Sequence, residues 1–145
     1  SSDLSDVMAD LMREAAPAEW DAQKRRVYED IQRLMINRLD YSDMFKIMDG
    51  LEYNGLMLYS MVQAENGEPV WSNIYIRNFE TRDNEIYVDP NLSDKVLIGE
   101  DGMSVFAYSF TDNCFEIRDK ASTGYVIESH TNFSALLSAL IDMVG

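Results

Sequence analysis

The sequence is poor in the residue types that disulfides, zinc sites and acid–base catalysis require. Its one cysteine, Cys114, cannot form an internal disulfide, which suits a reducing compartment. Its one histidine, His130, is the sole candidate for the usual general base near neutral pH, and a hydrogen-bonded structural role is more typical of such a residue. One histidine and one cysteine also fall short of the about four nitrogen or sulfur ligands of zinc. These shortages count against zinc enzymes and cysteine–histidine enzymes.

Long apolar runs are missing as well. No run approaches the roughly 20 residues that span a bilayer, and the beginning of the sequence lacks the basic and then apolar segment of an export signal. We therefore expect a cytoplasmic protein with no membrane partner.

Basic residues are scarce relative to acidic ones. Twelve Lys and Arg against 26 Asp and Glu give a net charge of −14, which repels phosphate backbones and anionic headgroups, so nucleic acid is not expected as a partner. The excess is concentrated in residues 51–145, which hold 15 acids and 5 bases. A partner steered by charge would be basic and would meet this part of the chain. The alternative is that the charge serves solubility alone.

Motifs for common reactions are absent from the sequence too. It contains no Gly-x-Ser-x-Gly elbow and no glycine-rich phosphate loop. Cys114 falls in a predicted strand, where a small core residue is more typical than an activated thiolate. Asp83, Asn84 and Glu85 are adjacent, unlike the spaced ligands of a calcium loop. We expect no enzyme activity, no cofactor and no metal.

The sequence does contain enough apolar material for one core. It has 145 residues, 46% of them hydrophobic, with eight Tyr, six Phe and two Trp. Residues 1–145 are therefore expected to form a single domain that needs neither disulfides nor metals. Two domains would leave each of them very small.

Helical spacing of apolar residues marks the first part of the chain. It predicts one helix over 3–16, a second that continues to about Arg38, and a short third helix that Ser42 caps and Gly50 ends. The apolar residues behind these three predictions are Leu4, Val7, Met8, Leu11, Met12, Trp20, Val27, Ile31, Leu34, Met35, Phe45 and Met48.

After Gly50 the pattern becomes that of strands. Strands are predicted over 56–62, 96–98, 104–110, 114–118 and 125–129, while 74–79 fits a strand or a helix and 80–84 fits a loop. Thr131 or Asn132 caps a final helix. This order predicts an α+β fold: an antiparallel-rich mixed sheet with N-terminal helices and a C-terminal helix packed on it. The residues expected in its core are Phe106, Phe115, Ile117, Leu136 and Leu140.

Four segments carry a resemblance to a known family. Residues 97–102 (LIGEDG), 104–108 (SVFAY), 115–119 (FEIRD) and 132–137 (NFSALL) have the order and spacing of motifs in the SUKH superfamily, and 49–59 is similar to its Asn-Gly-Leu segment. The chain resembles in particular the YrhA-like branch, from roughly Asp49 to Val144. It departs from the pattern at Asn132, where the family usually has Ser, and in its helical first 40 residues.

The resemblance implies a SUKH-like α+β domain and, for most bacterial members, an immunity protein that binds and neutralises a polymorphic toxin of the same cell. Many such toxins are basic nucleases, and opposite charges speed association. Two alternatives stay open: a regulatory or scaffolding module of the same fold, and an acidic mimic of nucleic acid. A toxin gene directly upstream would favour the first hypothesis, whereas several partners without such a gene would favour the second.

Acidic and aromatic residues coincide around the stretch from Glu80 to Asp101, which has seven acids and two bases. Large rings supply anchoring area in interfaces, and carboxylates supply steering and pairing. The alternative is that these acids lie on solvated loops and the rings belong to the core. The residues predicted to contact a basic partner are Trp71, Asp83, Glu85, Tyr87, Asp89, Glu100 and Asp101.

Overall fold

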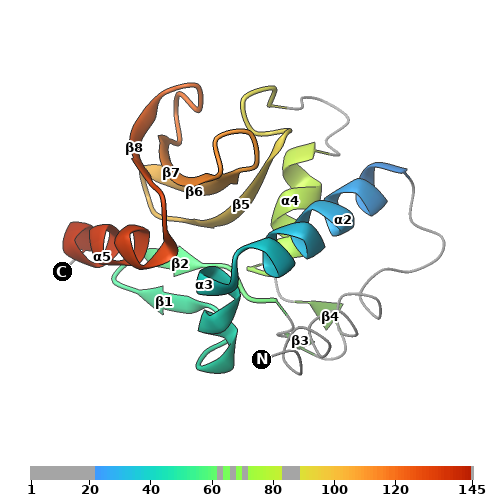
Figure 1. The fold of residues 1–145 in the computed structure, drawn as a ribbon, viewed down its shortest axis with the longest axis horizontal. Helices are drawn as coiled ribbons and strands as arrows, with labels where there is room; N and C mark the ends of the chain where they lie inside the picture. Colours follow the sequence, from blue (N-terminus) through green and yellow to red (C-terminus); the bar gives the residue numbers. More distant parts are fainter. Residues whose placement is uncertain (1–21, 62–63, 66–67, 70–71, 83–88, 145) are drawn as a thin grey trace.

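The computed structural model describes residues 22–61, 64–65, 68–69, 72–82 and 89–144 (Figure 1). The predicted helix over 3–16 lies outside these residues. The helices are α2 (Ala22–Asn37), α3 (Leu39–Ser42), α4 (Ile74–Arg82) and α5 (Phe133–Val144), with a 3-10 turn at Asp43–Lys46. The strands are β1 (Leu51–Tyr53), β2 (Leu56–Leu58), β3 (Ala64–Glu65), β4 (Glu68–Pro69), β5 (Lys95–Glu100), β6 (Ser104–Ser109), β7 (Cys114–Asp119) and β8 (Val126–His130).

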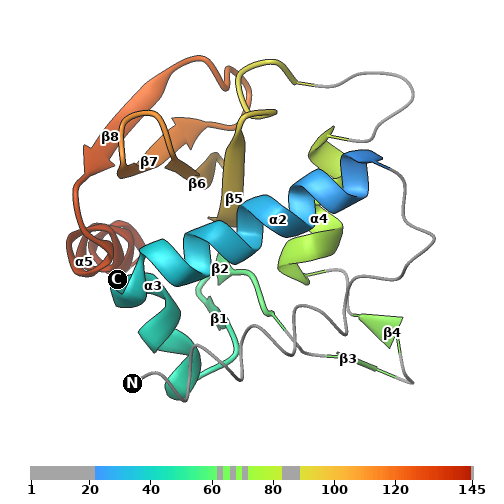
Figure 2. The same cartoon turned by 45° about the vertical axis from the view of Figure 1, so that its right-hand side comes forward.

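Six of these strands form one sheet in the order β1-β2-β5-β6-β7-β8, and β3 and β4 form a separate hairpin. The predicted α+β fold is confirmed. Every pair of neighbouring strands is antiparallel, and the parallel pairing found in the described residues is an isolated bridge between Ser60 and Asn73. The sheet curls, with α5 below β7 and β8 and with α2 and α4 side by side near β5 (Figures 1 and 2).

The core lies between one face of the sheet and the helices. Cross-strand partners share a face, which places Tyr108 with Phe115 and Phe106 with Ile117. The Phe115 ring lies with its centroid 5.6 Å from that of Phe133 in α5 and 6.1 Å from that of Tyr41 in α3. The predicted core is confirmed, because full burial is found for Phe106, Phe115, Ile117, Leu136 and Leu140.

Residues 74–79, which fit a strand or a helix by sequence, belong to helix α4. Asn73 caps this helix, since its side-chain oxygen accepts a hydrogen bond of 2.9 Å from the N–H of Tyr75. The helix continues to Arg82, so the predicted loop over 80–84 is wrong for its first three residues. Arg82 is the reason: its side chain is 1% exposed, forms an ion pair with Asp30 of α2 and donates to the carbonyl of Lys95 at 2.6 Å.

Helix α4 also covers the edge of β5 beyond the end of β2. The side-chain amide of Asn78 accepts a hydrogen bond from the N–H of Leu97 at 2.8 Å and donates to the C=O of Leu97 at 2.9 Å. One side chain thus takes the place of a paired strand. A bare edge of this kind would otherwise leave buried backbone groups without partners.

The segment before β5 differs from its prediction in two places. The strand predicted over 56–62 ends at Leu58, and it pairs with β1, which the sequence did not predict. Asn54 and Gly55 have φ of 49° and 85° and form the two-residue turn between β1 and β2. Gly50 has the expected left-handed φ of 87°.

Ser42 is not the helix cap that the sequence predicts. The helical turn already begins at Leu39, Ser42 has helical φ and ψ, and its hydroxyl donates to the carbonyl of Leu39 at 3.4 Å. The final helix is capped by Asn132, whose side-chain oxygen accepts from the N–H of Ala135 at 2.8 Å. Among the residues that the structure describes, no helix has the length and apolar character needed to cross a membrane.

Candidate functional site

The three predicted contacts that the structure describes line two different hollows. Asp89 and Glu100 line a hollow of about 340 Å³ beside α4, here called the α4 hollow. Asp101 lines a different one. The other predicted contacts, which lie outside the described residues, are Trp71, Asp83, Glu85 and Tyr87.

Glu100 is held by a network of three side chains. Its carboxylate accepts hydrogen bonds from the hydroxyl of Tyr59 at 2.7 Å, from Arg77 at 2.9 Å and from Lys120 at 2.8 Å. Arg77 also pairs with Glu80 at 2.8 Å. The side chain of Glu100 is 17% exposed, so its charge is already compensated within the protein.

The electrostatics of Glu100 agree with this geometry. Burial raises the pKa of its carboxyl group, but hydrogen bonds from Lys120 and Tyr59 and the charges of Arg77 and Lys120 lower it by more. The net pKa is therefore below its usual value, and Glu100 stays ionised. Such a group stabilises the local structure more readily than it recruits a partner.

Asp89 and Asp101 also bond within their own surroundings. Asp89 accepts from the hydroxyl of Thr123 at 2.5 Å and from the N–H of Asn91 at 2.9 Å. Asp101 accepts from the N–H groups of Met103 at 2.8 Å and Ser104 at 2.7 Å, which holds the turn between β5 and β6. Neither carboxylate has an ion-pair partner within the described part of the chain.

All five basic residues of 51–145 are used in ion pairs inside the protein. Arg77 pairs with Glu80 and Glu100, Arg82 with Asp30, and Lys120 with Glu100; the remaining two pairs are Lys95 with Asp94 and Arg118 with Glu116. The negative excess predicted for this part of the chain is therefore left on other acids. Those without an ion-pair partner in the described residues are Glu52, Asp89, Asp101, Asp112, Asp119, Glu128 and Asp142.

Two of these acids, Asp101 and Asp119, line a larger hollow at the end of the sheet, here called the β8 hollow. Its volume is about 560 Å³. Exposed apolar side chains form much of its lining: Met103 is 79% exposed, Tyr125 63%, Met143 48% and Ile127 44%. The other lining residues are Asn54, Gly55, Asp101, Gly102, Ser104 and Asp119.

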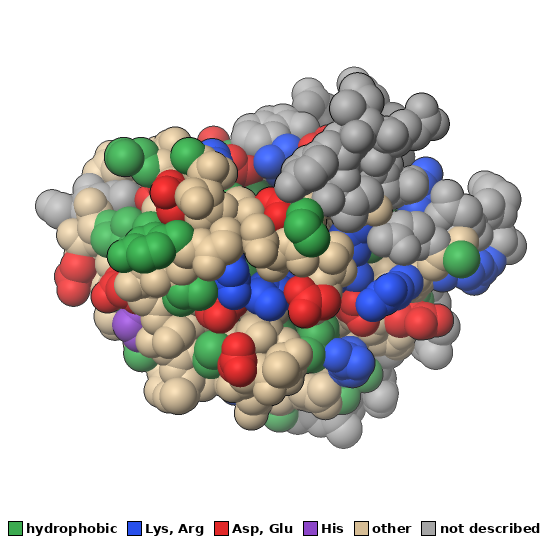
Figure 3. All heavy atoms as spheres, turned by 90° about the horizontal axis from the view of Figure 1, so that it is seen from above, with side chains coloured by type: hydrophobic (Ala, Val, Ile, Leu, Met, Phe, Trp, Pro, Cys, Tyr) green, Lys and Arg blue, Asp and Glu red, His purple; other side chains and the backbone are tan. Residues whose placement is uncertain are grey.

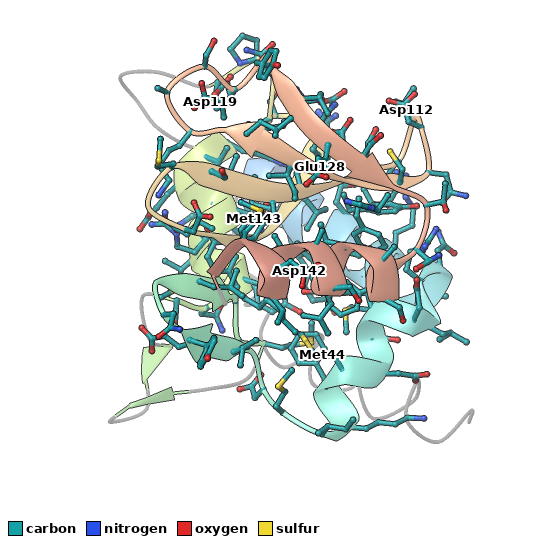
Figure 4. All side chains as sticks on the ribbon, turned by 90° about the vertical axis from the view of Figure 1, so that its left-hand side faces the viewer. Met44, Asp112, Asp119, Glu128, Asp142 and Met143 are labelled. Atoms are coloured by element: carbon teal, nitrogen blue, oxygen red, sulfur yellow. The ribbon has the colours of Figure 1, made fainter. Side chains whose placement is uncertain are left out.

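The figures show how acids and apolar groups combine here. In Figure 4, Glu128 lies above α5, Asp142 and Met143 lie on α5, and Asp119 lies at the hairpin above them. Figure 3 shows Lys, Arg, Asp and Glu side chains interleaved over the middle of the upper face, while apolar side chains gather toward its left end next to acids. An exposed apolar patch with a charged rim is typical of a protein-binding surface.

Sequence reasoning did not find the β8 hollow. Asp101 is its one lining residue among the predicted contacts, because those contacts come from a continuous acidic stretch, whereas residues of β6, β7, β8, α5 and the adjoining turns line the hollow. A usable signal was present in Tyr125, Val126 and Ile127: in three consecutive apolar residues of extended chain, at least one is exposed unless both faces are buried. The structure exposes all three.

The residues considered for catalysis are poorly placed for it. Burial raises the pKa of the Cys114 thiol, and the charges of Glu116 and Asp112 raise it further against weaker opposition from Arg118 and Lys95, so little thiolate forms near neutral pH. The hydrogen bond expected for His130 is not present at Nε2, which is buried without a partner among the described residues. In the same residues, no group of three or more His, Cys, Asp or Glu could hold a metal ion.

Comparison with known proteins gives one informative relative. The chain is 31% identical over 83 residues to the uncharacterized protein YrhA of Escherichia coli (strain K12). The match covers 57% of this chain and 58% of YrhA, so the chain spans little more than half of that protein's length. No family model matches, and no solved structure matches. The likeness to YrhA that the motifs indicated is thus confirmed over these 83 residues.

Proposed function

We propose that this protein is a cytoplasmic immunity protein of the SUKH superfamily, which neutralises a basic toxin domain by binding it and not by chemistry. The observation that carries the proposal is the charge arrangement of residues 51–145. Every base of this part forms an internal ion pair, while Asp101 and Asp119, which have no ion-pair partner in the described residues, line a hollow with exposed apolar side chains. Such a surface attracts a basic protein and offers it apolar area to bury.

Two further observations support a binding role. The motifs that resemble the SUKH family include Asp101, Gly102, Ser104 and Asp119, which line the β8 hollow. The two acids that line the hollow come from the turn after β5 and from the end of β7, as in a folded interface rather than a flexible acidic tail. Opposite charge raises association rates by about 10 to 1,000-fold at low salt, which suits an inhibitor that must act before a toxin does.

The proposal predicts that a secreted protein is encoded beside this gene, and the test uses the C-terminal domain of that protein. Co-expression with the immunity protein should restore growth of cells that produce this domain, and the two purified proteins should form a stable complex whose association slows as salt rises. Growth arrest that persists and no complex at low salt would contradict the proposal. A variant in which Asp142 and Glu128 are both changed to Lys should fold normally but should protect the cells less than the parent protein does.

The same experiment distinguishes the proposed function from its two alternatives. A regulatory or scaffolding module of the same fold would leave the toxin domain fully active and would bind several unrelated host proteins. An acidic mimic of nucleic acid would bind many DNA-binding proteins with similar affinity, because uniform charge discriminates little among basic partners.

A further inference from the structure

Strand β8 is a free edge of the six-stranded sheet. It is the last strand in the order β1-β2-β5-β6-β7-β8, and no other described strand pairs with its outer side. All of its residues before His130 are exposed, including Val126 and Ile127. Since every second residue of an edge strand directs its N–H and C=O outward, β8 offers unpaired backbone groups to another chain.

This edge lacks most of the features that keep edge strands from pairing. Proteins usually protect an edge with Lys, Pro, β-bulges or very short strands. Strand β8 has five residues, none of them Lys or Pro, and its one irregularity, opposite Ile117 and Arg118, leaves the pairing from Glu128 to His130 regular. The opposite edge, β1, has three residues. Of the two edges, β8 is therefore the one suited to accept a strand.

The charges near β8 select the kind of strand. Glu128 is the one charged residue of β8 apart from the histidine at its end, and it pairs with Ile117 on the neighbouring strand. A strand added on the outer side would place a side chain directly beside Glu128, where Lys or Arg is favoured and an acid is disfavoured. A second copy of this chain pairing through the same edge would bring two Glu128 side chains near each other, so self-association is the poorer choice.

The β8 hollow continues this edge. Ile127 belongs to both features, Tyr125 directly precedes β8 and lines the hollow, and Asp119 and Asp101 also line it. A chain that pairs with β8 can thus bury apolar side chains in the hollow and bring cationic ones to its acids. Main-chain hydrogen bonds would give affinity, and these side-chain sites would give specificity.

We infer that the partner binds by adding a basic, extended strand to the free edge of β8, with apolar side chains seated in the β8 hollow; this inference rests on the proposed function. It specifies that the toxin domain must present a basic, extended segment with apolar side chains. It also assigns Glu128 as the central charge of the interface.

The experiment measures binding of the full chain to the purified C-terminal domain of the protein encoded beside it. Glu128→Lys should weaken the affinity by about 30-fold or more, as expected for reversal of a central interface charge. Asp112→Lys is the matched control, because Asp112 is also an exposed acid without an ion-pair partner in the described residues, and it lies in the turn between β6 and β7, outside the lining of the β8 hollow. It should change the affinity by less than about threefold.

Amide hydrogen exchange followed by NMR tests the mode of binding. In the complex, alternate amides of residues 126–130 should exchange at least about tenfold more slowly, since each gains a hydrogen bond to the added strand. Protection at residues 72–82 or 89–101 without change in β8 would overturn the inference. A Glu128→Lys variant that binds as tightly as the parent would also overturn it. The same holds if sedimentation shows that the parent protein alone forms dimers and that Glu128→Lys changes this dimerisation.

The failures of the two proposals are distinguishable. If the parent protein does not bind the toxin domain, the proposed function and this inference fall together. If the parent binds and protects cells while the β8 variants behave like the parent, the function stands and strand addition is wrong.

Discussion

Asn78 shows how much of this fold depends on single polar side chains that look unremarkable in the sequence. It sits on α4, is 1% exposed and bonds both backbone groups of Leu97 as well as the carbonyl of Ile74. Nothing in the pattern of residues 74–79 indicates this role, because the partner is 19 positions away. The same holds for Arg82, whose ion pair with Asp30 joins α4 to α2.

Replacing Asn78 with Leu should lower the free energy of unfolding by about 2–4 kcal/mol, because two buried backbone groups of Leu97 would lose their partners. Urea unfolding followed by circular dichroism measures the change. Asn91→Ala is the control: Asn91 is exposed, and its side chain makes a long hydrogen bond of 3.4 Å to Thr123. A loss as small as in the control would show that the edge of β5 does not need Asn78.

Phe115 is the residue at which the aromatic core converges. Its ring packs with Tyr41, Tyr108 and Phe133 and lies beneath the guanidinium of Arg38 at 4.9 Å. Phe115→Ala should therefore cost about 3–5 kcal/mol of unfolding free energy. Thermal and urea unfolding are the measurements, with the exposed Tyr125→Ala as a comparison, and a cost below about 1 kcal/mol would contradict the burial described.

Among the elements, those with strong periodicity and clear punctuation were predicted well. The strands β6 and β7 and the helix α5 match their predictions within about two residues, because alternating or helical apolar patterns end there at turn or cap residues. The helix α4 could not be separated from a strand, since nine residues with mixed polarity fit both periods. The strand β1 was missed because its three residues gain their structure from pairing with β2.

The candidate site was less predictable than the fold. The sequence located the acidic excess in the second part of the chain but not its counter-charges, which depend on contacts such as those of Glu100 with Arg77 and Lys120. The distance between two residues along the chain does not determine which carboxylates form ion pairs with bases. Trp71 and the acids of 83–85 remain predictions, since they lie outside the described residues.

The cap of α5 gives an element-scale test of a choice that the sequence left open. Asn132→Ala should lower the unfolding free energy by about 1 kcal/mol, because the side chain accepts the hydrogen bond from Ala135 that satisfies the helix terminus. Thr131→Ala should change it little, since the contact described for Thr131 uses its backbone carbonyl with Arg38. Denaturant unfolding of the two variants decides between them, and equal losses would show that both residues cap the helix.

Across the whole molecule, charge is divided between two uses. Bases and some acids form internal pairs that fix elements to one another, as with Glu100 between β5, α4 and the residue after β7. The remaining acids give the net charge of −14, which opposes compaction but favours solubility and steering. The stability and the binding surface therefore depend on different carboxylates. The dependence of the unfolding free energy on pH should reveal the paired ones.

Stability should fall in acid through the paired carboxylates. Burial raises the pKa of Asp40, but hydrogen bonds from Arg38 and the N–H of Phe133 lower it below its ordinary value, and the pKa of Glu100 is lowered likewise. A carboxyl group with a depressed folded pKa stabilises the protein above its ordinary pKa and loses that contribution as pH falls further. The unfolding free energy should thus decrease below about pH 4.5, the ordinary pKa of Glu.

Glu100→Gln should be less stable than the parent at pH 7, and its unfolding free energy should fall less steeply in acid. Glu128→Gln, which removes an acid without an ion pair, should keep the parent's slope. Urea unfolding from pH 3 to 7 measures both, and identical slopes for all three proteins would place the acid-sensitive groups elsewhere.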